Sequence, residues 1–226
     1  MKTLEKQILE ANRWIVDKGL VELTWGNVSA KDFSNQTICI KPSGIQLSTA
    51  NIQDMSVVDS SGALLSGKKP SVDLPTHLEL YNVFPEIGCV VHTHSKYATI
   101  FAQASTPIPC LGTTHADYFY GEIPCVPHPS SDKMDAYEVN TGKIIGEHFH
   151  NNSLNYEQIA ACIVDGHGPF VWGKTIEKAL KNAYVLEIVA EMAYKSLILN
   201  SKSNLNQFII DKHFLRKHGE QKYYGQ

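Results

Sequence analysis

The chain has 226 residues, of which 43% are hydrophobic, and its formal net charge is −3. This length allows one large domain with a full hydrophobic core, which we expect to span residues 1–226. Lysine and arginine form no cluster of the kind that binds nucleic acid, so the sequence predicts no nucleic-acid partner. Residues 1–20 alternate charged and apolar side chains, unlike a signal peptide or a membrane span, so we expect no membrane partner.

The cysteines form an odd-numbered set without a CxxC pair. Most of them lie in apolar runs, where a reduced thiol packs as a small hydrophobe. They predict a soluble protein in a reducing cytoplasm. The five are Cys39, Cys89, Cys110, Cys125 and Cys162.

Helical spacing of apolar residues predicts the first element, a helix over 3–18 with Gly19 as its C-cap. Short apolar segments between turn residues then predict three strands, of which the last two are joined by a hairpin turn at 59–62. These strands are 37–40, 55–58 and 63–65.

The rest of the chain alternates predicted helices and strands. The helices are 74–83, 96–104 and 175–199, and the strands are 87–93 and 161–164. The proline-containing segment 124–135 is typical of an exposed connection. The mixture predicts an α/β or an α+β fold, and the pattern leaves that choice open.

The stretch VVHTHS places His92 and His94 directly after an apolar run. In an extended strand, residues i and i+2 point to the same face, so both imidazoles can reach one ion while Thr93 faces away. The alternative is a pair of independently hydrogen-bonded histidines at a strand end. The pair alone does not decide between them.

A third histidine also follows a predicted strand. His167 stands between Gly166 and Gly168, which let the backbone pass close to a ligand. Alone it is typical of an ordinary loop histidine. Together with the pair it completes the three-histidine set of catalytic zinc sites, which keep one position open.

Asp73 offers an oxygen ligand, but it precedes a predicted helix that has an early proline, which is a usual N-cap arrangement. From the residues alone the cap is favoured. A cap can still hold a carboxylate at the edge of a site.

Several strings together resemble the class II aldolase/adducin family, and within it the L-ribulose-5-phosphate 4-epimerases. Many aldolase relatives share VHTHS, whereas GTTHADYFYG and the terminal YYGQ are more specific to the epimerases. The resemblance implies a single-domain fold with a central, mainly antiparallel sheet flanked by helices. The matching strings span almost the whole chain: LTWGNVSA (23–30), IKPSG (40–44), KKPSVDLPTH (68–77), VHTHSKYATI (91–100), GTTHADYFYG (112–121), HGPFVWGK (167–174), KHFLRKHG and KYYGQ (212–226).

By this resemblance, His92, His94 and His167 would bind a divalent ion, Zn²⁺ in the first place, with Asp73 as a further ligand. Sites of histidine and carboxylate also accept other divalent ions. Aldolase members commonly have glutamate at the position of Asp73, so the aspartate favours the epimerase branch.

The resemblance also implies a set of substrate contacts, largely to a phosphate. At position 72, where many relatives have a second serine, this chain has Val72, which offers only its backbone N–H as a donor. Lys41 would add charge nearby, with a solvated strand lysine as the alternative. The set is Gly26, Asn27, Ser43, Gly44, Ser71 and Val72.

Asp117 and Tyr224 correspond to the family's acid and base, which approach the metal from a neighbouring subunit. This implies a homotetramer with active sites between subunits. From the residues alone, Asp117 is typical of a turn or cap and Tyr224 of a mobile tail. His213, Thr113 and Glu138 would assist, although packing explains each of them equally well.

The implied reaction interconverts L-ribulose 5-phosphate and D-xylulose 5-phosphate by metal-assisted cleavage and re-formation of the C3–C4 bond, because C4 carries no acidic C–H. The absence of a convincing GxGxxG string agrees with a reaction that needs no nicotinamide. Two other functions compete with this one. One is a class II sugar-phosphate aldolase that releases the fragments, and the other is a noncatalytic adducin-like interaction module.

Overall fold

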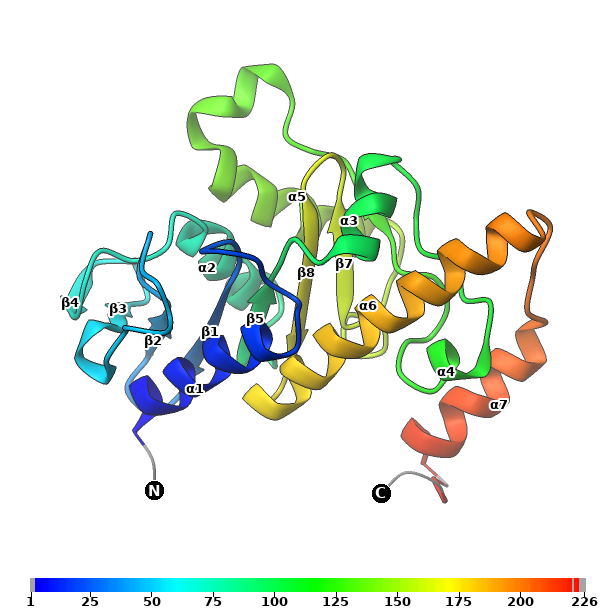
Figure 1. The fold of residues 1–226 in the computed structure, drawn as a ribbon, viewed down its shortest axis with the longest axis horizontal. Coiled ribbons are helices and arrows are strands. Elements are labelled where there is room, and N and C mark those ends of the chain that lie inside the picture. Colours follow the sequence, from blue (N-terminus) through cyan, green and yellow to red (C-terminus); the bar gives the residue numbers. More distant parts are fainter. Residues whose placement is uncertain (1–2, 221, 224–226) are drawn as a thin grey trace.

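The computed structural model describes residues 3–220, 222 and 223, in which eight strands form one sheet in the order β4-β3-β2-β1-β5-β8-β7-β6 (Figure 1). Within this part of the chain every neighbouring pair is antiparallel except β6 and β7. The strands are β1 (Asn27–Asp32), β2 (Thr37–Ile40), β3 (Ser56–Asp59), β4 (Leu64–Ser66), β5 (Cys89–His92), β6 (Cys125–Val126), β7 (Ala161–Val164) and β8 (Gly168–Gly173).

Helices cover both faces of this sheet, so the expected α/β fold with a mainly antiparallel sheet is confirmed. Helix α6 contacts α1 and α3, and all three pack on strands on one face, while α2 packs against α5 on the other (Figure 1). The α-helices are α1 (Leu4–Asp17), α2 (Leu74–Val83), α3 (Lys96–Gln103), α4 (Thr113–Ala116), α5 (Tyr137–Asn151), α6 (Ile176–Leu199) and α7 (Gln207–His218). The 3-10 helices are η1 (Ile52–Asp54) and η2 (Ser131–Ala136).

Aromatic side chains join the α2 and α5 layer to the sheet. Trp172 of β8 has its ring 5.0 Å from Phe84, just after α2, and 5.3 Å from Phe149 of α5. These rings are almost completely shielded from water. Burial of such large apolar groups is the main source of stability in a core of this kind.

A polar contact also fixes α2 on the sheet. The hydroxyl of Ser29 on β1 lies 2.7 Å from His77 Nδ1 and 2.7 Å from the hydroxyl of Tyr81, both on α2. All three side chains are buried. Because an unpaired buried polar group is costly, these bonds set the position of α2 along β1.

Two glycines let α5 approach α2 closely. A Cβ on Gly142 would lie 2.4 Å from Glu79 Cβ and 3.0 Å from the carbonyl oxygen of Thr76. A Cβ on Gly146 would lie 3.0 Å from Val83. The four-residue spacing of these glycines places both on the helix face that meets α2.

The sequence pattern identifies most elements but misses several. It omits β1, β8, α5 and α7, although their residues are ordered in the fold. The segment 124–135 is largely exposed, as predicted, but it also contains β6 and most of η2. Strand β6 pairs through just Cys125 and Val126, which is too short to give a periodic signal.

None of the helices in the described ranges is both long enough and apolar enough to cross a bilayer. The five cysteines are unpaired, and four of them are buried. Burial raises the pKa of Cys39 to about 12, so this thiol packs as a neutral core group.

Replacing Gly142 by alanine tests the close approach of α5 to α2. We expect Gly142→Ala to lower the free energy of unfolding by about 1–3 kcal/mol through overpacking, despite the better helix propensity of alanine. Urea denaturation measures the change. The control is Gly112→Ala, where an added Cβ meets nothing within 4 Å and φ is −154°. Equal stabilities for the two variants would contradict this account of the helix contact.

Candidate metal centre

The candidate site forms where three adjacent strands begin or end at the same edge of the sheet. In the antiparallel register, Asn27 at the start of β1 pairs with His92 at the end of β5, which pairs with Phe170 near the start of β8. His94 follows β5, and His167 lies in the turn before β8. Strand pairing therefore brings together residues that are 140 positions apart in the chain.

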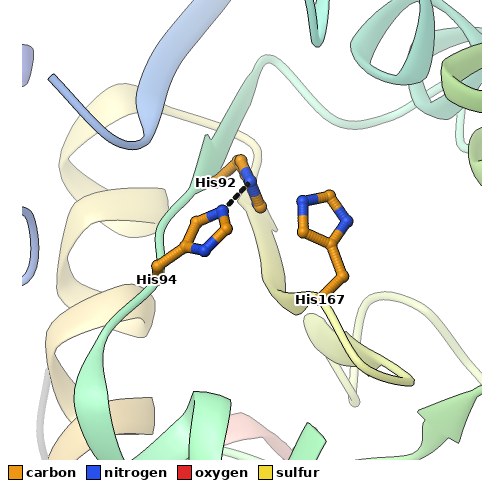
Figure 2. Close-up of side chains that lie close together, drawn as sticks. All are labelled: His92, His94 and His167. Carbon is orange, nitrogen blue, oxygen red and sulfur yellow. Dashed lines mark hydrogen bonds between the residues drawn. The ribbon is translucent and has the colours of Figure 1, made fainter. Parts of the chain in front are cut away.

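The side chains of His92, His94 and His167 face one another (Figure 2). Each offers a nitrogen within 4.8 Å of the others, and His92 Nε2 lies 3.2 Å from His94 Nε2. Strand β5 ends at His92, one residue before the predicted end of the strand, and His94 follows it. The two rings nevertheless reach the same point, as the i, i+2 spacing predicts.

The close approach of these segments requires glycine. A Cβ on Gly168 would lie 2.8 Å from the carbonyl oxygen of Thr93, and one on Gly26 would lie 2.6 Å from the carbonyl oxygen of His92. Gly26 also has φ +74°, which is favourable for glycine. Both glycines are therefore needed to pack the backbone around the histidines.

Burial keeps the three imidazoles neutral. It lowers the pKa of His92 to about 3, although Asp73 opposes this shift. The pKa of His94 and that of His167 are also lowered, chiefly by burial. A neutral imidazole retains the lone pair that binds a metal ion.

The hydrogen bonding of His92 fixes which nitrogen carries the lone pair. Its Nδ1 lies 3.0 Å from the carbonyl oxygen of Pro169, which can only accept. The proton therefore resides on Nδ1, and Nε2 is free to bind. Two nitrogens at about 2.0–2.1 Å from a tetrahedral zinc ion lie roughly 3.3 Å apart, which fits the 3.2 Å separation from His94.

Asp73 occupies the N-cap position of α2, but its side chain makes no capping hydrogen bond. The carboxylate instead accepts from Asn27 Nδ2 at 2.7 Å and lies 3.4 Å from the Ser71 hydroxyl. The cap role favoured by the residues alone is therefore wrong for the side chain. Burial raises the pKa of Asp73, but His92, His77 and the Asn27 bond outweigh it and lower the pKa overall.

A cavity of about 420 Å³ contains these groups together. Asp73 also lines this cavity, but its carboxylate is not part of the group of ligand atoms that lie within 4.8 Å of one another. All six residues expected to contact substrate also line it, and Val72 is 60% exposed there. The lining is Thr24, Trp25, Gly26, Asn27, Lys41, Ser43, Gly44, Ser71, Val72, Asp73, His92, His94 and His167.

Lys41 is a buried cation of this cavity. It is 3% exposed and donates to the carbonyl oxygen of Thr24 at 2.9 Å, so the alternative of a solvated strand lysine is wrong. Burial lowers the pKa of its ammonium group, and Asp73 opposes the shift. The cavity thus combines a cationic side with hydroxyl and amide groups, which is suited to an anionic, hydroxylated ligand.

Asn27 has its donors already engaged. Its Nδ2 bonds to Asp73 and to the Ser71 hydroxyl at 3.0 Å, while its buried Oδ1 has no partner among the described residues. This amide oxygen can accept a hydrogen bond from an N–H or O–H group, but it repels a phosphate oxygen. In this arrangement, Asn27 orients Asp73 and offers an acceptor to a ligand hydroxyl.

Asp117 lies in a separate charged cluster formed by α4 and α7, and it does not line the histidine cavity. Arg216 donates to both of its oxygens at 3.1 and 3.0 Å, and His213 Nδ1 lies 3.1 Å away. Burial raises the pKa of Asp117, but bonds from Arg216 and His213, with Lys217 nearby, lower it overall. Tyr224 lies outside the described residues.

The three further residues named from the sequence have different surroundings. His213 is a direct partner of Asp117. Thr113 accepts the backbone hydrogen bond of Asp117 N at 2.9 Å, and the carbonyl of Glu138 accepts from the Thr76 hydroxyl at 2.7 Å. Among these three described residues, His213 is the one whose side chain contacts the Asp117 carboxylate.

Sequence reasoning missed three residues beside the histidines. Trp25 has its ring 6.4 Å from that of His94, His77 packs at 6.2 Å on Phe170, and the Tyr137 hydroxyl lies 3.3 Å from His167 Nδ1. The helix that begins with Tyr137 was not predicted. No local pattern therefore pointed to this tyrosine.

Comparison with known proteins identifies the family. Residues 6–194 match the Class II Aldolase and Adducin N-terminal domain, and the chain belongs to this family. The fold is similar to an L-fuculose 1-phosphate aldolase, with 20% identity and a TM-score of 0.78 over 94% of this chain and 96% of that one.

Two further structures show the same fold. YgbL from Klebsiella pneumoniae is 23% identical with a TM-score of 0.73, covering 92% of this chain and 96% of that one. A sugar-phosphate aldolase from Thermotoga maritima is 19% identical with a TM-score of 0.67, covering 87% and 96%. At this identity the likeness establishes the fold, and the histidine cluster makes ligands for a divalent metal available.

Buried neutral histidines predict acid sensitivity of the metal-free protein. Burial lowers the pKa of His77 to about 4, His92 to about 3 and His115 to about 4. The unfolded chain, with histidine pKa values near 6.5, then binds more protons as pH falls from 6.5 to about 4. At pH 5 each of these histidines should therefore lower the free energy of unfolding by about 2 kcal/mol relative to neutral pH. Denaturant titrations at pH 7.5 and pH 5 measure this, and equal stabilities would contradict neutral burial.

Proposed function

We propose that this protein is an L-ribulose-5-phosphate 4-epimerase that interconverts L-ribulose 5-phosphate and D-xylulose 5-phosphate. The observation that carries the proposal is one cavity that combines three neutral histidines, a carboxylate and a buried lysine with hydroxyl groups. Epimerase-like strings in the sequence, GTTHADYFYG and the terminal YYGQ, select this activity among those of the family.

His92, His94 and His167 would hold a divalent ion, Zn²⁺ in the first place, with Asp73 as a further ligand. The ion would act as a Lewis acid that stabilises the negative charge left on the ketone fragment when C3–C4 breaks. Asn27 donates to the Asp73 carboxylate at 2.7 Å, and both residues line this cavity.

The phosphate would be bound by other groups that line the same cavity. Ser43 and Gly44 supply hydroxyl and backbone donors, Ser71 supplies a further hydroxyl, and Lys41 supplies positive charge. At position 72 only the backbone N–H would contribute, because valine has no hydroxyl. A phosphate held in this way keeps the two-carbon aldehyde fragment in place while its carbonyl turns to the other face.

Two proton transfers complete the reaction. One group removes the proton of the C4 hydroxyl during cleavage, and another protonates the C4 oxygen after the bond re-forms on the opposite face. Asp117 and Tyr224 would perform these steps. Asp117 is a carboxylate whose cationic partners lower its pKa, so it is ionised at neutral pH and has an oxygen that can accept a proton.

The charged cluster around Asp117 does not line the cavity of its own protomer. We therefore propose that a neighbouring copy supplies Asp117 to each metal site in a homotetramer. In a closed ring of identical copies, every metal site lies next to an Asp117 from the neighbouring copy.

A class II sugar-phosphate aldolase is the alternative function. It is favoured by the similarity to the fold of an L-fuculose 1-phosphate aldolase. Such an enzyme uses the same cleavage but releases both fragments. A noncatalytic interaction module of the adducin type is disfavoured, since the metal-binding side chains are present.

Product analysis distinguishes the two enzymes. Purified protein with Zn²⁺ and L-ribulose 5-phosphate should give D-xylulose 5-phosphate, with cleaved fragments at trace level, because the phosphate grip retains the aldehyde. Chromatography with mass detection quantifies the sugar phosphates, glycolaldehyde phosphate and dihydroxyacetone. Accumulation of the two fragments in place of D-xylulose 5-phosphate would reject the epimerase in favour of the aldolase.

Mixed oligomers test whether sites are shared between copies. His94→Ala should lose zinc and turnover, and Asp117→Asn should keep zinc but lose turnover. When the two variants are co-expressed, roughly one quarter of the sites combine an intact metal half with an intact Asp117, so activity should return to about that level. His150→Ala, at an exposed position of α5, is the control for histidine removal. A mixture that stays as inactive as its components would place both groups in one protomer.

A further inference from the structure

The histidine ligands differ in what holds their second nitrogen. His92 Nδ1 faces a backbone carbonyl, that of Pro169, which fixes its proton whatever side chains surround it. His167 Nδ1 faces the hydroxyl of Tyr137 at 3.3 Å. A hydroxyl can donate or accept, so the state of His167 depends on this single side chain.

Tyr137 is held in place independently of the histidines. It is the first residue of α5, and its carbonyl accepts from the Thr141 hydroxyl at 2.8 Å. The next residue, Glu138, accepts through its carbonyl from the Thr76 hydroxyl of α2 at 2.7 Å. Close packing at Gly142 keeps the two helices together.

The same helix therefore positions two different groups of the site. Asp73 stands at the N-terminus of α2, and Thr76 in its first turn ties down the start of α5 and thus Tyr137. The Tyr137 ring lies 6.0 Å from the His167 ring. Figure 2 shows the opposite edge of the His167 ring, which carries Nε2, turned toward His92 and His94.

We propose that Tyr137 is a positioning residue whose hydroxyl oxygen accepts the Nδ1–H of His167, so that Nε2 presents its lone pair to a divalent metal ion. If the hydroxyl donated instead, the proton of the neutral ring would reside on Nε2, and this nitrogen would be unable to bind. The neutral imidazole in water favours the Nε2–H form, so Tyr137 reverses the intrinsic preference. The inference rests on the three-histidine metal site of the proposed function and does not depend on the reaction.

The tautomer of His167 in the metal-free protein gives a direct test. With ¹⁵N-labelled histidine, long-range ¹H–¹⁵N spectra distinguish the two forms, and His167→Gln assigns the signals. We expect the Nδ1–H form in the wild type and a shift toward Nε2–H in Tyr137→Phe. In competition with a chromophoric chelator, Tyr137→Phe should bind Zn²⁺ about 10–100-fold more weakly, as for loss of other outer hydrogen bonds to metal ligands.

Tyr184→Phe is the matched control, because it removes a phenolic hydroxyl from α6, where the ring packs on Trp14. It should keep the wild-type tautomer and zinc affinity. A wild-type His167 in the Nε2–H form, or an unchanged tautomer in Tyr137→Phe, would overturn the proposal. A fall in zinc affinity without a change of tautomer would also overturn it, since the tyrosine would then act by packing alone.

These measurements separate the inference from the proposed function. Neither readout uses turnover, so a protein without epimerase activity can still confirm the role of Tyr137. A wild type that binds no Zn²⁺ would reject the metal-dependent epimerase, while the tautomer would still report on the hydrogen bond.

Discussion

The close packing of backbone segments at one edge of the sheet is the constraint on which the site depends. Gly26 and Gly168 each occupy a position where a Cβ would come within 3 Å of a carbonyl oxygen beside the histidines. This contact brings the start of β1 and the turn before β8 against the end of β5. A side chain at either glycine would separate these segments and disperse the three imidazoles. The metal centre is thus a consequence of strand pairing, with the ligands added at the ends of the strands.

Buried side chains of β8 and α2 provide the low-polarity surroundings that the ligands need. Phe170 stacks on His92 at 4.2 Å and also contacts His77, which is bound to the Ser29 hydroxyl. A neutral imidazole is a better ligand than a protonated one, and burial here disfavours protonation of His92. The same burial would be costly for Asp73 alone, and the bond from Asn27 offsets that cost. The same surroundings therefore lower the pKa of both groups, so that Asp73 is charged and His92 is neutral.

What the sequence predicts well is what local spacing determines. The i, i+2 pair at His92 and the glycines around His167 could be recognised because each lies directly after an apolar strand. Asp73 shows the limit of such reasoning, since its capping position is local but its carboxylate is turned by Asn27, 46 residues earlier. Tyr137 could not be predicted at all, because its contact with His167 depends on how α5 packs on α2. That packing depends on Gly142, because the contact with α2 leaves no room for a side chain at this position.

The residues proposed for metal binding and those proposed for proton transfer are distributed differently along the chain. The family match ends at residue 194, before α7, which carries the cations that hold Asp117. In the proposed reaction, bond cleavage needs the metal ligands and a base for the C4 hydroxyl, whereas inversion also needs a proton donor on the opposite face and a retained aldehyde. Tyr224 and the partners of Asp117 all follow the matched region. In the proposed reaction, a chain that kept residues 6–194 but changed α7 and the tail would keep the metal-binding side chains and lose Tyr224 and the partners of Asp117, on which movement of the C4 hydroxyl proton depends.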